Sequence, residues 1–257
     1  MRAARYSMAL LWLGVVLTTP VHAELATVAV ASNFSTPMQT LITRFEQQSG
    51  HRIRVAFGSS GKLYAQIEHG APFDVFLSAD TGKPQALIAA GNADANNRFT
   101  YAIGRLVLWS GPNGDDSHAM LSNRQFRKLA IANPHLAPYG TAAIQTLQQF
   151  ALYEAVKQQL VIGENIAQTY QFIATGNAQL GFVAMAQIID NGAVPAGAWP
   201  VPEALYSPIK QDAVLLKHGE NNVAARALLD YLRSPAAGVI IEQFGYRLPE
   251  KPYNAVQ

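Results

Sequence analysis

Short apolar runs alternate with segments of helical periodicity from residue 26 onward. The run ATVAVAS at residues 26–32 has the length and composition of a buried strand. After it, apolar residues recur at the spacing of one helix face, behind Thr36 as a cap and Pro37 as the first helical residue. Two more strand and helix units follow at residues 52–70 and 72–90. Three such units in succession predict a parallel sheet covered by helices.

The same alternation restarts in the second half of the chain, beyond a loop rich in Gly, Pro and Asp. Predicted strands lie at residues 128–134, 160–163, 178–184 and 209–217, and predicted helices at residues 139–159, 165–176, 221–232 and 235–245. A long strand-like run at residues 98–110 precedes this half. Extended crossings near residues 101–106 and 206–211 would join the two halves. The pattern therefore predicts an α/β protein, either as one large domain or as two lobes of about 100 residues each. With two lobes, lobe 1 would comprise residues 24–103 plus 209–257 and lobe 2 residues 104–208.

The first 23 residues have the features of a secretory signal peptide. Two arginines precede an apolar run of about ten residues, and small side chains at Val21 and Ala23 suit a signal peptidase. The run is too short to span a bilayer, which takes about 20 residues. We expect cleavage after Ala23, which would leave 234 of the 257 residues in an exported, periplasmic protein.

Charge and composition exclude several function classes. The whole chain has 19 Lys and Arg against 17 Asp and Glu, and loss of Arg2 and Arg5 with the leader would make the mature protein neutral. A nucleic-acid partner is not expected, because no basic stripe with interleaved aromatic residues occurs. The sequence has no Cys, so it offers neither a disulfide nor a thiolate nucleophile. The histidines lack metal-ligand spacing, and we expect them at the surface.

Candidate ligand-binding residues lie where predicted strands end, since ligands of open α/β sheets bind at the carboxyl ends of strands. The relevant loops contain Ser32 and Asn33, the turn Gly-Ser-Ser-Gly with Ser60, Tyr139 before one helix, and Ile166 at the start of another. These loops are rich in neutral hydrogen-bond donors, and only Lys62 and Glu164 bring charge close. A cleft of such donors and helix N-termini suits a desolvated oxyanion.

Each of these residues also has a structural interpretation. Ser32 and Asn33 are common turn formers, and Ser60 is placed as an ordinary helix cap. Tyr139 could simply pack beside Pro138, and Ile166 could belong to the core. The Gly-Ser-Ser-Gly-Lys turn fits neither a P-loop nor a nucleophile elbow, because the required glycines are missing.

Several motifs together resemble one family. VAVASNF, FGSSGKLYAQIEHGAPFDVFLSAD, RFTYAIGRLVLWS, ANPHLAPYG and LGFVAMAQII are similar, in order and spacing, to segments of the periplasmic molybdate-binding proteins of molybdate ABC transporters. The resemblance implies a type II solute-binding fold, in which two lobes with mixed, mostly parallel sheets flanked by helices are joined by two hinge crossings. It also implies closure on a tetrahedral oxyanion, molybdate or tungstate, and delivery to a membrane permease with its ATPase.

The resemblance assigns anion contacts to five residues: Ser32, Asn33, Ser60, Tyr139 through its main-chain N–H, and Ile166 through its main-chain N–H. Many family members have a tyrosine after the G-x-V strand, whose hydroxyl reaches the anion. This chain has Ala184 there. We expect that contact to be absent, and Asn33 is a candidate to replace it.

The leading hypothesis is a monomeric, non-enzymatic molybdate- and tungstate-binding protein without a cofactor. A second is a protein of the same fold that binds another oxyanion or an iron complex. A third is an exported hydrolase with Ser60 as nucleophile, which would need a base that the sequence does not offer nearby. A fourth, a structural or adhesive protein, is disfavoured because donor-rich loops at strand ends serve no packing purpose.

Overall fold

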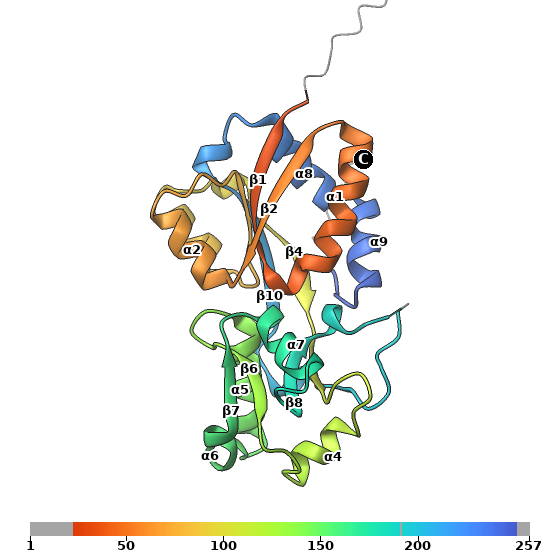
Figure 1. The fold of residues 1–257 in the computed structure, drawn as a ribbon. Helices are drawn as coiled ribbons and strands as arrows, with labels where there is room; N and C mark the ends of the chain where they lie inside the picture. Colours follow the sequence, from red (N-terminus) through yellow and green to blue (C-terminus); the bar gives the residue numbers. More distant parts are fainter. Residues whose placement is uncertain (1–22, 191, 251–257) are drawn as a thin grey trace, which may run out of the picture.

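The computed structural model describes residues 23–190 and 192–250. The predicted signal peptide, except Ala23, and the end of the chain lie outside the described residues. The described chain forms two five-stranded sheets, each flanked by helices (Figure 1). We call the part built on the first sheet lobe 1 and the part built on the second sheet lobe 2. No described helix is long and apolar enough to cross a membrane.

Lobe 1 has the sheet order β2-β1-β3-β10-β4, in which β10 runs against the other strands. Its strands are β1 (Leu25–Ala31), β2 (Arg52–Gly58), β3 (Val75–Leu77), β4 (Phe99–Gly104) and β10 (Ile209–Leu215). Its helices are α1 (Ser35–Ser49), α2 (Ser60–Glu68), α3 (Gly82–Ala89), α8 (Val223–Arg233) and α9 (Pro235–Gln243). The parallel pairing of β1 with β2 and β3 is the pairing that the three strand and helix units predict.

Lobe 2 repeats the plan with the order β7-β6-β8-β5-β9, in which β5 is the reversed strand. Its strands are β5 (Leu106–Trp109), β6 (Leu129–Ala132), β7 (Leu160–Gly163), β8 (Leu180–Ala184) and β9 (Trp199–Pro200). Its helices are α4 (Ser117–Ser122), α5 (Pro138–Gln149), α6 (Tyr153–Val156) and α7 (Ile166–Ala174). In both lobes four of the five strands point the same way, so the mixed, mostly parallel sheets are confirmed.

Apolar packing on both faces of each sheet explains the continuous apolar runs. In β1, Val28 and Val30 join a core with α1, α8 and α9, whereas Ala29 joins a core with α2 on the opposite face. The sheet of lobe 2 likewise has one core on each face. Strands that are buried on both faces lose the alternation of apolar and polar residues that marks a half-exposed strand.

Two predictions about secondary-structure elements and one about the exposure of a residue need correction. The strand-like run at residues 98–110 is two strands, because the chain leaves one sheet at Gly104 and enters the other at Leu106. The helix predicted at residues 139–159 ends at Gln149, and Ala151 then has a φ of +54°, which no right-handed helix contains. His51 was expected at the surface but is buried, and its Nδ1 accepts a hydrogen bond from the Glu24 N–H.

The two lobes meet where β4 leads into β5 and where the chain enters β10 (Figure 1). These are the crossings expected near residues 101–106 and 206–211. The exact lobe boundaries, at 103/104 and 208/209, stay a prediction. The arrangement places the carboxyl ends of β1 and β2 opposite the N-termini of α5 and α7.

Candidate functional site

A small cavity between the lobes brings all five predicted site residues together: Ser32, Asn33, Ser60, Tyr139 and Ile166. The other residues that line it are small residues and one proline: Ala31, Gly58, Ser59, Ala79, Ala137 and Pro138. The cavity volume is about 10 Å³, far below the roughly 300–1,000 Å³ of pockets for drug-sized molecules. None of these lining residues is charged. The site therefore suits a small ligand that binds through hydrogen bonds.

On the lobe 1 side, the chain leaves β1 directly into a tight turn. Ser32–Phe34 forms one 3-10 turn that runs into α1 at Ser35, so the helix starts before the predicted cap Thr36. Both Ser32 and Asn33 are almost fully buried at the cavity. Among the hydrogen bonds of the described residues, none involves the Ser32 hydroxyl, which leaves that group available to a ligand.

Two adjacent serines at the start of α2 have separate roles, whereas the sequence interpretation considered Ser60 alone for both the helix cap and the ligand contact. Ser59, which the prediction passed over, is the helix cap, and its Oγ accepts a hydrogen bond from the Lys62 N–H at 3.3 Å. Ser60 is the first helical residue, and its Oγ accepts a hydrogen bond from the Ala79 N–H at 2.9 Å. Because that N–H occupies an acceptor position, the hydroxyl proton of Ser60 remains to be donated into the cavity.

On the lobe 2 side, two helix N-termini face the cavity. Pro138 and Tyr139 are the first two residues of α5, and Ile166 is the first residue of α7, where the Asn165 side chain caps the helix as predicted. The first N–H groups of a helix have no partner within the helix and form its positive end. The main-chain N–H groups of Tyr139 and Ile166 are therefore donors to whatever the cavity holds. Their side chains pack in the core of lobe 2.

Gln187 supports the start of α7 and was missed by the sequence interpretation. Its Nε2 donates to the Ile166 carbonyl at 3.0 Å, and its Oε1 accepts from the Ala184 N–H at 2.9 Å. Ala184 is fully buried and does not line the cavity. Position 184 thus supports the site only through Gln187, and no local pattern in the sequence indicated that role.

Two contacts close the cleft in front of the cavity. The Gly61 N–H donates to the Leu136 carbonyl of lobe 2 at 2.9 Å, and a Cβ on Gly61 would lie 3.0 Å from the Leu136 Cα. Lys62, expected in solvent, forms an ion pair with Glu164 of lobe 2, with 2.6 Å between Nζ and Oε1. Both charged side chains remain about half exposed. The structure is therefore a closed form, in which the lobes touch through the turn after β2.

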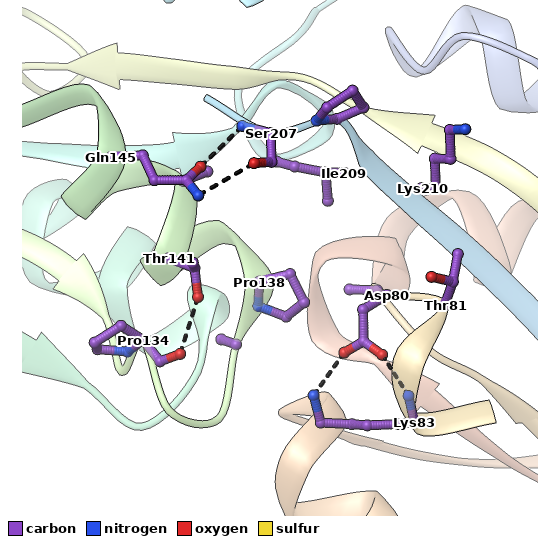
Figure 2. Close-up of a pocket in the computed structure, with 14 residues that line it drawn as sticks. Asp80, Thr81, Lys83, Pro134, Pro138, Thr141, Gln145, Ser207, Ile209 and Lys210 are labelled. Atoms are coloured by element: carbon purple, nitrogen blue, oxygen red, sulfur yellow. Dashed lines mark hydrogen bonds and ion pairs between the residues drawn. The ribbon is translucent and has the colours of Figure 1, made fainter. Parts of the chain in front are cut away.

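A larger opening of about 310 Å³ adjoins the cavity and shares Ala79, Ala137 and Pro138 with it. Figure 2 shows that some of its polar side chains are paired, whereas no interaction is drawn for Thr81 and Lys210. Asp80 accepts hydrogen bonds from the main-chain N–H and Nζ of Lys83, and Gln145 bonds to Ser207. The opening therefore differs from the smaller cavity in having charged side chains in its lining, Asp80, Lys83 and Lys210.

The electrostatics of the cavity favour an unprotonated anion. Its lining supplies hydroxyls and main-chain N–H groups at three helix N-termini, which together favour negative charge without a cation. Burial raises the pKa of the Tyr139 phenol well above its ordinary value, so this side chain stays neutral. The lining residues include no histidine and no carboxylate that could activate Ser60 as a nucleophile.

Comparisons with known proteins agree with this geometry. Residues 26–247 match the model of the bacterial extracellular solute-binding proteins. The chain belongs to this family. It is 50% identical over 224 residues to the molybdate-binding protein ModA of Azotobacter vinelandii, covering 86% of this chain and 89% of that protein. It is 47% identical over 232 residues to ModA of Rhodobacter capsulatus, covering 90% and 91% of the two chains.

The fold of this solute-binding protein also matches solved structures. The periplasmic molybdate-binding protein of Azotobacter vinelandii aligns with a TM-score of 0.84 at 39% identity, over 88% of this chain and 100% of that one. The sulfate-binding protein SubI of Mycobacterium tuberculosis aligns with a TM-score of 0.70 at 13% identity, which shows the shared fold alone. The predicted two-lobed solute-binding fold and the predicted family resemblance are confirmed, and the relatives are binding proteins, as predicted, and not enzymes.

Proposed function

We propose that this protein captures molybdate or tungstate in the cavity between its lobes and delivers the anion to an ABC permease and its ATPase. One observation carries the proposal. Five residues from four separate loops, Ser32, Asn33, Ser60, Tyr139 and Ile166, line one small cavity that has donors and no charged side chain. Two relatives of nearly the same length, at 50% and 47% identity, are named molybdate-binding proteins.

A tetrahedral oxyanion without protons fits this cavity because it offers hydroxyls and main-chain N–H groups, all of which can donate a hydrogen bond. Ser32 and Ser60 offer hydroxyl protons, and Tyr139 and Ile166 offer main-chain N–H groups. Phosphate keeps at least one proton near neutral pH, and burying that O–H without an acceptor costs about 1–3 kcal/mol. Two acceptors are candidates: Glu164, which is bound to Lys62, and the side-chain carbonyl of Asn33, which lines the cavity. Sulfate carries no proton, so only its smaller size can exclude it.

The rest of the proposal concerns export of the protein to the periplasm and delivery of the anion to the permease. The leader at residues 1–23 would direct export and be cleaved after Ala23, which places the mature protein in the periplasm as a monomer. Delivery requires the closed form to meet the permease and the lobes to part again. Hinge motion about the crossings near Ile103 and Ile209 is the simplest way to expose the cavity.

Isothermal titration of the mature protein with a panel of oxyanions tests the proposal. We expect molybdate and tungstate to bind well ahead of sulfate, and phosphate to bind weakest. Competition titrations at neutral pH give the ratios directly. Phosphate or sulfate binding within about tenfold of molybdate would falsify the donor-only account of the cavity.

A further inference from the structure

A neutral hydrogen-bonded cluster of five buried side chains lies against the cavity. We call it the hinge network, and it consists of Asn33, Tyr101, Tyr139, Gln211 and Tyr246. Each of these residues is at most 4% exposed. Tyr139 comes from lobe 2 and the others from lobe 1, so the network crosses between the lobes at β4 and β10.

The protons of Asn33 are fully committed to this network. Its Nδ2 donates one hydrogen bond to Gln211 Oε1 at 2.8 Å and another to the Tyr246 hydroxyl at 2.9 Å. The Tyr246 hydroxyl in turn donates to the Asn33 main-chain carbonyl at 2.8 Å. An amide nitrogen has two protons, so none remains for an anion. Of the Asn33 donors, only the main-chain N–H is left for the ligand.

Gln211 connects Asn33 to the other lobe. Its Oε1 also accepts from the Tyr101 hydroxyl at 3.0 Å, and its Nε2 donates to the Tyr139 hydroxyl at 3.4 Å. The pairing of β10 with β4 shifts register between Gln211 and Asp212, and such bulges are a common way to re-aim a side chain. The space is tight, because a Cβ on Gly104 would overlap the Tyr139 hydroxyl and Gln211 Nε2.

Asn33 and Tyr139 therefore share one property: each lines the cavity and holds its side chain in the hinge network. Gln211 is hydrogen-bonded to both of these side chains. Hydrogen bonds to a charged ligand weaken steeply when donors shift by a few tenths of an ångström, so the network controls how well donors from the two lobes fit one ion.

We infer that Gln211 is a positioning residue for anion binding. Together with Tyr246, it fixes the position of the Ser32–Phe34 turn of lobe 1 relative to the start of α5 in lobe 2. This inference rests on the proposed function. It assigns Asn33 a main-chain contact with the anion and a side-chain role in the hinge. The tyrosine contact missing at Ala184 is then not replaced by the Asn33 amide.

The test compares Gln211→Met and Tyr246→Phe with the wild-type mature protein. Met keeps the length of Gln but neither donates nor accepts as Gln does, and Phe keeps the ring that packs edge-on against Phe34. We expect the Kd for molybdate to rise by roughly tenfold or more in both variants, as for other groups that orient a ligand's direct contacts. Stopped-flow measurements should place most of the change in the dissociation rate.

Thr100→Val is the matched control. Thr100 Oγ1 donates to the buried Asp212 Oδ1 at 2.6 Å, in the same pair of strands but outside the hinge network. Loss of this bond should lower the melting temperature while the Kd stays within about twofold of wild type. A group that only stabilises the fold would change melting in this way and leave the affinity of the folded protein unchanged.

Each outcome decides the matter. An unchanged Kd in folded Gln211→Met and Tyr246→Phe would overturn the positioning role while the proposed function stands. Equal weakening in Thr100→Val would also overturn it, because the effect would then be general destabilisation. If Gln211→Met does not fold, Tyr246→Phe decides alone, since its ring is retained. If the wild-type protein binds neither molybdate nor tungstate, the titration of wild type alone rejects the proposed function, and the positioning role falls with it.

Discussion

Replacement of Ser60 by alanine probes the proposed site most directly. Ser60 Oγ accepts one hydrogen bond from the Ala79 N–H and has its own proton free toward the cavity. The substitution removes a hydrogen bond to a charged acceptor, which is worth about 1.5–3 kcal/mol in a dry site. At 1.4 kcal/mol per factor of ten, we expect the Kd for molybdate to rise roughly 10- to 150-fold.

The same substitution has a second effect that must be kept apart from the first. Without Ser60 Oγ, the Ala79 N–H loses its partner, and an unpaired buried donor costs about 1–3 kcal/mol. That cost is present with and without the anion, so it lowers the free energy of unfolding and leaves the binding free energy unchanged. Urea unfolding of the ligand-free protein measures the stability, and calorimetric titration measures the binding.

Ser78→Ala is the control for this experiment. Ser78 is fully buried, its Oγ accepts from the Asp80 N–H at 3.3 Å, and it does not line the cavity. We expect lower stability and an unchanged Kd. A Ser60→Ala protein that binds molybdate within about threefold of wild type would refute the placement of the anion at Ser60, because the loss expected there is at least about tenfold.

Four further outcomes follow from the structure. Lys62→Ala breaks the half-exposed ion pair with Glu164 and should raise the Kd at most about fivefold, since such pairs contribute about 0.2–1 kcal/mol, with a smaller effect in high salt; calorimetry at two salt concentrations checks this. Affinity for molybdate should stay flat from about pH 7 to about pH 9, because burial raises the pKa of Tyr139 and of Tyr246, and both lose their protons only at still higher pH; titrations across this range would expose any step. Gly104→Ala should destabilise the closed protein by about 1–3 kcal/mol through overlap with the Tyr139 hydroxyl, as measured by unfolding in the presence of molybdate. Small-angle scattering should show a smaller radius of gyration after molybdate is added, and equal radii at saturation would contradict closure by hinge bending.

Most of the secondary structure could be predicted from the sequence, because burial leaves a local signature. β1 has an apolar run since both of its faces are covered, and α7 has a recognisable cap at Asn165. The errors fall where a non-local cause acts. Arg105 separates β4 from β5 only because two different sheets lie on either side of it.

The candidate site was also largely predictable, for a topological reason. Parallel strands bring their carboxyl ends to one edge of a sheet, so donor-rich loops far apart in the sequence are expected to meet there. Ser32, Ser60, Tyr139 and Ile166 do line one cavity. The order of the elements was enough to predict the loops, whereas the resemblance to the molybdate-binding proteins was needed to choose the individual residues in them.

The sequence by itself therefore determined the fold class and which loops line the cavity. Only the tertiary structure decided which donors in those loops remain free. Asn33 is a donor by residue type, yet its amide protons are taken by Gln211, 178 positions later, and by Tyr246, 213 positions later. Such pairing depends on where the folded chain places distant side chains, to within the few tenths of an ångström that a hydrogen bond allows, and no local pattern encodes it.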